Sequence, residues 1–382
     1  MRVAIIGIGG TGSATARHLA KAGHTVTGYE QFQIGHDRGS SHGESRIIRY
    51  TYPDLLFTQI MGDAYPLWAD LEAEAEERLL VRCGGLYFGD RNDSHVQITE
   101  ASLQQVGLPY DVLEPSDMAT RFPAMRLKPN EIALYQPESG FLRATRCVLA
   151  QARLAKRAGA VLRENTAVSG IEQHGAEVLV TTSEGETNRY DRVIVTAGAW
   201  MQSLFATLNL PLTVTRQQVT YLQIAQNAGY FQQGSLPVWI DSTANYYGFP
   251  QDGKIDGVKI ACHDFGGTVH PDAVERTVDA SYIDAVRDYA RLRMPDLSSE
   301  VTYQQVCLYT VTHNEDFIID TVPEMPHVLL VSGCSGHGFK FTALLGNIAT
   351  LWATEQPYAR DLSRFTLLRF RNSKGEVSNA HL

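Results

Sequence analysis

The first thirty residues contain a pattern that can hold the phosphates of a dinucleotide. The run Arg2–Ile6 is short, apolar and rich in β-branched residues, which is typical of a buried parallel strand. A GxGxxG turn follows it, then a helical stretch that stops at Gly23 and a second strand that ends at Glu30. In such a turn the backbone approaches a pyrophosphate, which then lies at the positive N-terminus of the helix. The pattern therefore assigns cofactor contacts to Gly7, Ile8, Gly9, Gly10, Thr11 and Gly12.

The parts of this pattern have separate tasks. Gly7 allows the tight turn, Gly9 lets the backbone come close to the phosphates, and Gly12 permits close packing of the helix on the strand. Glu30 can accept hydrogen bonds from the adenosine ribose, and its charge disfavours a 2′-phosphate. The complete series of strand, turn, helix, strand and acid favours a dinucleotide over a glycine-rich turn without a ligand. It does not choose between NAD and FAD, but the chain lacks the regular βα units with which a nicotinamide enzyme would be expected to continue.

The thiols raise a second chemical possibility. The five cysteines are odd in number and widely spaced, with no CxxC or zinc-type spacing, which favours a reducing compartment and neither disulfides nor a metal site. Cys307 lies in the alternating stretch QVCLYTV, which is typical of a strand. A thiol there is usually a small core residue, but it could also be attached covalently to another group.

Composition narrows the classes of partner. The chain has 382 residues, 44% hydrophobic and 20% charged, as expected for a globular protein of two domains or one elaborate domain. Its net charge is −9 and its Lys and Arg form no dense run, so nucleic acid is not expected as a partner. No apolar run approaches the roughly 20 residues that span a bilayer, and the N-terminus does not read as a signal peptide. We therefore expect a cytoplasmic protein that does not associate with a membrane.

The helices and strands that must position these residues form two kinds of region, one with alternating strands and helices and one with mostly strands. Residues 1–30 and 317–355 read as strands alternating with helices, and an amphipathic helix ending at Gly159 leads into short strands up to residue 197. A long helix is expected at about 55–80 and a short strand over 83–89. Residues 211–316 read mostly as strands, including 257–265, with one helix near 272–293.

This alternation predicts a discontinuous architecture of α/β plus α+β class. A Rossmann-like nucleotide domain is assembled from residues 1–82, 141–212 and 318–382. A substrate domain with a large antiparallel sheet is inserted as residues 83–140 and 213–317. Such an arrangement suits a flavin enzyme, whose ring system must lie between the nucleotide domain and the substrate lid.

Several longer motifs make the sequence more specific. The pieces GSSHGESRIIR, YYGFP, GVKIACH, VCLYT, FIID and SGHGFKF, in this order, resemble the family of monomeric sarcosine oxidase and N-methyl-L-tryptophan oxidase, which are FAD-dependent amine oxidases. The resemblance covers essentially the whole chain. The chain departs from the family pattern where SHHGD is replaced by SSHGE and where the usual Thr is Ser45. These departures leave the side chain of the substrate in doubt.

The resemblance implies a monomeric flavoprotein that oxidises a secondary amine of the N-methyl amino acid type with O2, giving an imine that hydrolyses and H2O2. It also implies FAD attached covalently through Cys307, with Cys334 as the alternative thiol and an inert core cysteine as the other interpretation. Matching positions place His42, Ser45, Arg46, Gly198, Trp200, Gly336, Gly338, Phe339 and Lys340 at the cofactor.

The same resemblance assigns roles toward substrate and oxygen. Arg49 and Lys340 would clamp the substrate carboxylate, and Lys259 would assist oxygen reduction. Arg46 would lie beside the flavin ring and His263 beside the substrate, and Tyr247 and Tyr309 would form aromatic walls. Arg46 and Arg49 could share one face if their segment is helical, and they would point to opposite faces if it is extended. The plainer alternatives are a surface ion pair for Arg49, a strand-edge lysine that reaches solvent for Lys259, and structural roles for the histidines and tyrosines.

Three other functions stay open on the sequence. An oxidase of pipecolate-like or fructosyl amino acids would use similar machinery. An NAD-dependent dehydrogenase would be colourless when purified, and a flavin-binding protein without catalysis would be yellow but not bleached by any secondary amino acid.

Overall fold

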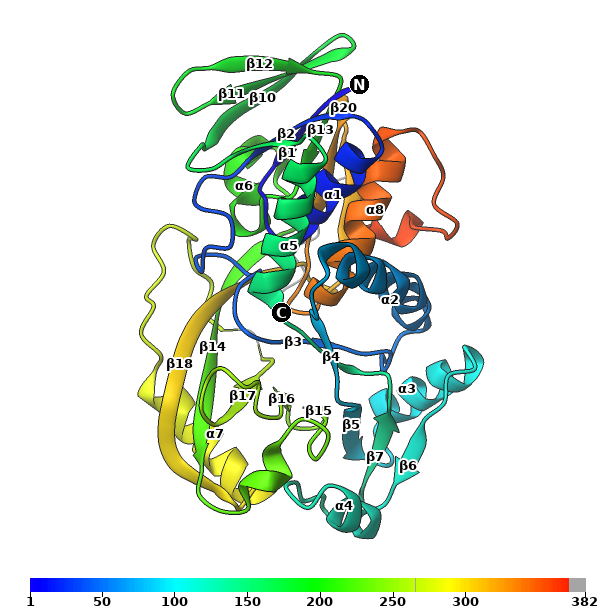
Figure 1. Ribbon diagram of the computed structural model, residues 1–382, viewed down its shortest axis with the longest axis vertical. Coiled ribbons are helices and arrows are strands. Elements are labelled where there is room, and N and C mark those ends of the chain that lie inside the picture. Colours follow the sequence, from blue (N-terminus) through cyan, green and yellow to red (C-terminus); the bar gives the residue numbers. More distant parts are fainter. Residues whose placement is uncertain (265, 371–382) are drawn as a thin grey trace.

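The predicted first strand lies inside a six-stranded sheet of the computed structural model, which describes residues 1–264 and 266–370 (Figure 1). The strand order is β19-β20-β13-β1-β2-β9, and all neighbours are parallel except β19 and β20. The strands are β1 (Arg2–Ile6), β2 (Thr25–Tyr29), β9 (Val161–Arg163), β13 (Arg192–Val195), β19 (Ile318–Val322) and β20 (Met325–Ser332). The central strands are buried, which explains their nearly continuous apolar sequences.

Helices from distant parts of the chain pack beside this sheet. Helix α1 (Gly10–Lys21) contacts both α5 (Ala144–Arg157) and α8 (Thr342–Ala353), and α2 (Leu55–Ala75) packs against α5 and α8. In Figure 1 these blue, green and orange helices lie together in the upper half of the molecule. The amphipathic sequence of α5 buries Cys147, Val148 and Leu154 in this contact.

The long helix predicted for residues 55–80 is five residues shorter at its C-terminal end. Helix α2 ends at Ala75, and Glu76 adopts a left-handed conformation with φ 52°. The Glu72 carboxylate accepts hydrogen bonds from the backbone N–H groups of Leu79 and Leu80 at 2.6 and 2.8 Å. These bonds turn the chain back, so that Leu80 begins strand β4 (Leu80–Arg82).

The second large sheet is mainly antiparallel and has eight strands in the order β18-β14-β17-β16-β15-β5-β7-β6. The pair β15 and β5 is parallel, which the expected antiparallel sheet did not include. The strands are β5 (Gly85–Asp90), β6 (Asp111–Leu113), β7 (Glu131–Gln136), β14 (Thr213–Ile224), β15 (Val238–Asp241), β16 (Tyr246–Gly248), β17 (Val258–Cys262) and β18 (Leu297–Val311). The strand expected over 257–265 thus ends at Cys262, and residue 265 lies outside the described residues.

The helix expected near 272–293 begins later, as α7 (Ala280–Arg293). The side chain of Arg216 on β14 explains the late start, because it binds the segment before the helix. Its guanidinium donates to the backbone carbonyls of Glu275 and Thr277 and pairs with Asp279, which holds residues 275–279 in a non-helical conformation. The other helices of this half are α3 (Ser94–Gln105) and α4 (Pro115–Arg121).

Two small sheets complete the fold. Strands β10 (Val168–His174), β11 (Glu177–Thr182) and β12 (Thr187–Tyr190) form an outer meander, followed after β13 by the short helix α6 (Met201–Leu204). Strands β3 (Arg46–Ile48) and β8 (Gly140–Leu142) pair with β4 in the order β3-β8-β4. The segment that holds Arg46 is therefore extended rather than helical.

These sheets confirm the predicted α/β plus α+β class. The six-stranded sheet takes its strands from residues 2–29, 161–195 and 318–332, and the eight-stranded sheet takes its strands from residues 85–136 and 213–311. This membership supports the division into domains at the predicted boundaries, which remains a proposal, and residues 371–382 of the last segment lie outside the described residues. Within the part of the chain that is described, no helix is both long and apolar enough to cross a membrane.

Candidate active site

A cavity of about 330 Å³ lies at the carboxyl ends of β1 and β2, where the predicted dinucleotide turn opens. Gly7 has φ +90°, which confirms the tight turn, and a Cβ on this residue would lie 2.7 Å from the carbonyl oxygen of Thr196. A Cβ on Gly12 would overlap the carbonyl oxygen of Gly7, so this glycine permits the close packing of helix on turn. The turn therefore has the geometry that the sequence pattern requires.

The predicted cofactor residues divide between the wall of this cavity and its supports. Glu30 is buried, and its carboxylate accepts hydrogen bonds from the backbone N–H groups of Ile8 at 2.9 Å and Phe32 at 3.1 Å. Residues Gly7, Ile8, Gly9, Glu30, Gly198 and Trp200 line the cavity. Residues Gly10, Thr11 and Gly12 are buried behind it and are not among its lining residues. The N-terminus of α1 thus borders a space that a phosphate group can enter.

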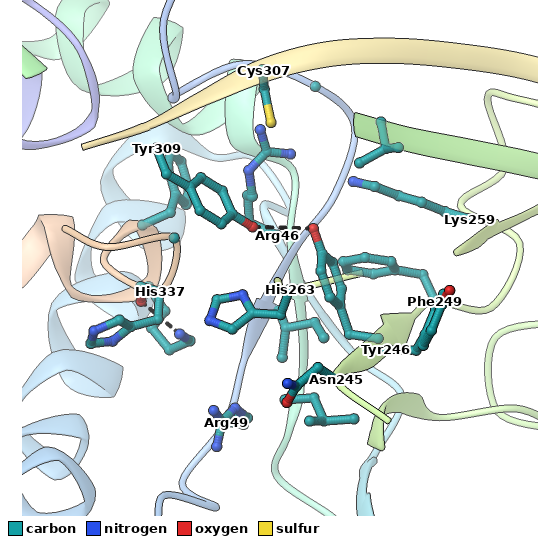
Figure 2. A pocket seen from close by; sticks show the side chains of 18 of the residues that line it. Arg46, Arg49, Asn245, Tyr246, Phe249, Lys259, His263, Cys307, Tyr309 and His337 are labelled. Atoms are coloured by element: carbon teal, nitrogen blue, oxygen red, sulfur yellow. Dashed lines mark hydrogen bonds between the residues drawn. The ribbon is translucent and has the colours of Figure 1, made fainter. Parts of the chain in front are cut away.

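A second cavity of about 590 Å³ lies between the eight-stranded sheet and the loop that follows β2 (Figure 2). Gly35 lines both cavities, so the two spaces adjoin along this loop. The predicted residues that line the larger cavity are His42, Arg46, Arg49, Tyr247, Lys259, His263, Cys307, Tyr309, Gly336, Phe339 and Lys340. Ser45 lies directly behind this wall, and Gly338 packs against Cys334. The structure therefore brings residues from five distant segments to one space.

One end of this cavity holds the thiol and two cations. Cys307 on β18 is buried, and in Figure 2 its sulfur points toward Arg46. Lys259 on β17 is 4% exposed, so it is not a strand-edge lysine that reaches solvent. Its Nζ donates to the Ser45 carbonyl at 3.0 Å and lies 4.6 Å from the centroid of the Phe249 ring. Burial and then the charge of Arg46 lower the pKa of Lys259 to about 7.

The two candidate thiols differ in their access to the cavity. Cys307 lines it, whereas Cys334 is not among its lining residues and packs against Gly338. Burial raises the pKa of the Cys307 thiol, while the nearby charges of Arg46 and Lys259 act in the opposite direction. The net effect is a raised pKa, and the cations of Arg46 and Lys259 only partly offset the cost of a buried thiolate.

The other end of the cavity holds a second pair of cations. The guanidinium of Arg49 lies 4.1 Å from the centroid of the Tyr52 ring, and its buried Nη1 has no hydrogen-bond partner. Lys340 is buried, and its Nζ donates to the Tyr52 hydroxyl and to the His337 carbonyl, each at 2.7 Å. Burial and then the charge of Arg49 lower the pKa of Lys340 well below its usual value. Neither Arg49 nor Lys340 forms an ion pair with another described residue, and Nη1 of Arg49 can donate to an anion.

Aromatic residues and a histidine lie between the two ends. The hydroxyls of Tyr247 and Tyr309 lie 3.4 Å apart, within hydrogen-bonding distance. His263 packs at their edge, with its ring centroid 5.8 Å from that of Tyr309. Burial, followed by the charges of Arg49 and Lys340, lowers the pKa of His263 to about 4. His263 is therefore neutral near pH 7.

The unpartnered polar atoms of this region fit a bound flavin dinucleotide. Both ring nitrogens of the buried His42 lack a hydrogen-bond partner, as does Nη1 of Arg49. Buried polar atoms in proteins are normally satisfied, so these atoms point to a polar ligand. Burial and the charge of Arg46 lower the pKa of His42 to about 3, so its neutral ring can both donate and accept. Together with the adjoining nucleotide cavity, these atoms can hold a ring system and its phosphates.

Sequence reasoning missed several residues of the site. Tyr52 contacts both cations of the second pair, and His337 binds Tyr52 through Nδ1 at 3.1 Å. Their closeness in sequence to Arg49 and Lys340 was a usable signal. Tyr221 lines the cavity because β14 pairs with β17, and its nearest predicted site residue in the sequence is far away. No local pattern could have found it.

Comparison with known proteins decides the family. Residues 2–352 match the family model described as FAD dependent oxidoreductase. The chain belongs to the FAD-dependent oxidoreductases. It is 34% identical to an N-methyl-L-tryptophan oxidase of Yersinia pestis, over 96% of this chain and 98% of that protein. The predicted resemblance is thereby confirmed, and FAD rather than NAD is the cofactor of the family.

Solved structures resemble this chain in fold. NikD, an unusual amino acid oxidase essential for nikkomycin biosynthesis, has a TM-score of 0.83 at 25% identity, with 95% of this chain and 96% of that chain covered. The L-proline dehydrogenase from P. horikoshii has a TM-score of 0.84 at 21% identity, with 99% of each chain covered, and this likeness concerns the fold.

Proposed function

We propose that this protein oxidises a secondary amine, an N-methyl amino acid in the first place, with O2 as the electron acceptor. The substrate is converted to an imine, which water hydrolyses to an aldehyde and an amine, and O2 is reduced to H2O2. FAD, when bound, takes two electrons from the C–N unit and passes them to O2. The observation that carries the proposal is the pair of half-buried Arg49 and buried Lys340 beside an aromatic cavity. The chain that holds this pair is 34% identical to an N-methyl-L-tryptophan oxidase over 96% of its length.

Arg49 and Lys340 are proposed to bind the carboxylate of the substrate. Arg49 presents an unpartnered Nη1, and a carboxylate can accept two parallel hydrogen bonds from a guanidinium. Tyr52 supports both cations through its ring and its hydroxyl, so their positions are fixed before a substrate enters. This arrangement orients the C–H bond of the substrate toward the middle of the cavity.

Tyr247, Tyr309 and His263 are proposed to form the walls around the amine. Amine oxidation needs the free amine, because its lone pair supports removal of the electrons. A neutral His263 does not repel or protonate that amine near pH 7, which its lowered pKa supports. The rings exclude water from the reacting bond.

Lys259 and Arg46 are proposed to assist the reduction of O2, and Cys307 to hold FAD covalently. A cation stabilises the negative charge that develops on oxygen, and it acts strongly in a buried site. The thiol of Cys307 lies at the same end of the cavity, whereas Cys334 does not line it. This difference supports Cys307 as the point of attachment.

Acid denaturation of the purified yellow protein tests the attachment. If FAD is covalent, the colour stays with the precipitated chain, and peptide mapping finds it on the peptide that contains Cys307. Cys307→Ser is expected to release FAD on denaturation, whereas the matched variant Cys334→Ser retains it. Retention in Cys307→Ser and release in Cys334→Ser would reverse the assignment.

Anaerobic mixing with candidate substrates tests the reaction. N-methyl-L-tryptophan or sarcosine is expected to bleach the flavin absorbance, and release of formaldehyde in air identifies oxidation of an N-methyl group. Bleaching by pipecolate or a fructosyl amino acid alone would favour those alternatives within the same class. A yellow protein that no secondary amino acid bleaches would contradict the proposed oxidase.

The proposal also covers the localisation of the protein, its oligomeric state and its partners. We propose a cytoplasmic monomer that takes a small amino acid and O2 and associates with neither nucleic acid nor a membrane. Its net charge of −9 supports the expectation that it does not bind nucleic acid.

A further inference from the structure

Two buried charges of opposite sign lie near the thiol end of the larger cavity. Lys259 is 4% exposed and Asp252 is 1% exposed. Neither forms an ion pair with any residue of 1–264 or 266–370. A buried charge without a partner is costly, so each of these groups requires an electrostatic explanation.

Tyr221 connects the environments of these two groups. Strands β14 and β17 are antiparallel, and Tyr221 lies directly opposite Lys259 in their register, so both side chains project from the same face of the sheet. Both residues line the cavity. The Tyr221 hydroxyl donates to Oδ2 of Asp252 at 3.2 Å. Burial, and then the charge of Asp252, raises the pKa of Tyr221, so the hydroxyl keeps its proton as a donor.

The carboxylate of Asp252 is fixed by uncharged donors. Its Oδ1 accepts hydrogen bonds from the backbone N–H groups of Lys254 at 2.9 Å and Ile255 at 3.0 Å. With the Tyr221 hydroxyl, three neutral donors hold the group in place. The carboxylate therefore forms no ion pair with a described residue, although the guanidinium of Arg143 donates to the Asp252 backbone carbonyl at 3.3 Å. Its negative charge acts on the buried ammonium of Lys259.

We propose that Asp252 is a positioning residue that serves, behind Tyr221, as the buried counter-ion of Lys259 and keeps its ammonium charged inside the cavity. The inference rests on the proposed role of Lys259 in oxygen reduction. Ser45 accepts hydrogen bonds from the same ammonium through its carbonyl at 3.0 Å and its hydroxyl at 3.4 Å. Asp252 thus provides the negative charge that compensates the ammonium, and the hydrogen bonds to Ser45 fix the position of the ammonium.

The balance of charges around Lys259 sets the direction of the expected effect. Burial and then Arg46 favour the neutral amine, whereas Cys307, Asp252 and Glu44, in that order, favour the ammonium. Asp252 is the first of the two carboxylates in this set. The titratable and charged groups that face Lys259 come from three strands and two loops: Arg46 on β3, Tyr221 on β14, Cys307 on β18, and His42, Glu44 and Asp252 in loops. When the charge of Asp252 is removed, less negative charge offsets the effect of Arg46 on the pKa of Lys259. Lys259 should therefore lose its proton at a lower pH.

The substitution Asp252→Asn tests this directly in the flavin-loaded protein. The charge of Lys259 is followed by NMR titration of protein labelled with ¹³C at lysine Cε, which is practical because the chain has seven lysines. Lys259→Met identifies the signal. We expect the midpoint to fall by about one pH unit in Asp252→Asn. Asp256→Asn removes an equal charge from an exposed position in the same loop and should leave the midpoint unchanged.

A midpoint in Asp252→Asn equal to that in Asp256→Asn would overturn the inference. Because Asp252 also caps the turn 252–255, Asp252→Ser is the second variant, since its hydroxyl can still accept from a backbone N–H group. It should show the same fall, and an unchanged midpoint there would count equally against the counter-ion.

Reoxidation in air separates this inference from the proposed function. If Lys259 assists oxygen reduction, the pH midpoint of the reoxidation rate moves down with the NMR midpoint. A fall in the NMR midpoint without any change in reoxidation would retain Asp252 as counter-ion and remove Lys259 from oxygen reduction.

Discussion

The individual residues of the cavity form two cationic pairs with different environments. Arg46 and Lys259 lie with Cys307, and Arg49 and Lys340 lie with His263 and His337. In each pair the arginine lowers the pKa of the buried lysine. Two separate positive sites suit a reaction in which one anion is a stable carboxylate and the other charge develops on oxygen.

Lys259→Met is expected to leave reduction by substrate about normal and to slow reoxidation by about 100-fold or more, because the charge that stabilises developing negative charge on oxygen is lost. Stopped-flow mixing of the reduced protein with oxygen measures the rate. In the unsubstituted protein the rate should fall as the pH rises through about 7, since the ammonium is present below its pKa. Lys254→Met, at an exposed lysine of the preceding loop, is the control. Equal reoxidation in both variants would remove Lys259 from this role.

Arg49→Ala is expected to weaken the binding of carboxylate substrates by about 30- to 100-fold, as for loss of a charge-assisted hydrogen bond of roughly 2–3 kcal/mol. Titration of the anaerobic flavin spectrum with a non-reacting carboxylate measures the dissociation constant. Arg49→Lys keeps the charge but not the planar donor pair, so it should recover part of the affinity. Unaltered affinity in Arg49→Ala would exclude the carboxylate clamp.

The helices and strands position these residues through contacts at their ends. Asp54 caps α2 by accepting from the backbone N–H groups of Leu56 and Phe57, and it also pairs with Arg364 at 2.6 Å. Arg364 in turn pairs with Asp316, which lies two residues before β19. One helix cap thereby ties α2 to the segment that borders the cavity.

Asp54→Ala is expected to lower the free energy of unfolding by about 1–2 kcal/mol, because it removes both a helix cap and an ion pair. Asp93→Ala removes the cap of α3, where the side chain accepts only from the N–H group of His95, and should cost about 0.5–1 kcal/mol. Urea unfolding followed by circular dichroism measures both. Equal losses would show that the ion pair with Arg364 contributes nothing to stability.

The whole molecule places its two cavities where distant segments of the chain meet. The smaller one lies at the carboxyl ends of β1 and β2, and the larger one is lined by residues of β14, β17 and β18 (Figure 2). A ligand that fills both would connect the six-stranded and the eight-stranded sheets. Binding of such a ligand should therefore stabilise the folded state.

Cys307→Ser protein freed of flavin is expected to unfold at a lower temperature than the same protein with FAD. At a free FAD concentration of 100 times the dissociation constant, the gain is about 2.7 kcal/mol, which corresponds to a rise of several degrees in Tm. Differential scanning calorimetry measures the shift, and NAD at the same concentration is the control. Stabilisation by NAD and not by FAD would favour the nicotinamide alternative.

The sequence alone determined the nucleotide-binding turn and the class of the fold. Gly7, Gly12 and Glu30 make their contacts within the first thirty residues or close to them in the fold. The hydrophobic periodicity that distinguishes strands from helices is also a local property of the chain. The motifs around Arg49, Cys307 and Lys340 were also sufficient to suggest the family. Helix ends were less predictable, because the Glu72 carboxylate and the Arg216 guanidinium bind backbone groups outside their own elements.

Only the tertiary structure decided how the charges are arranged. Whether Lys259 reached solvent, and whether Arg46 and Arg49 shared one end of the cavity, depended on strand pairing. The link from Tyr221 to Asp252 joins positions 31 residues apart and has no sequence signature. Electrostatic effects depend on distance and burial, and these exist only after the sheets have packed.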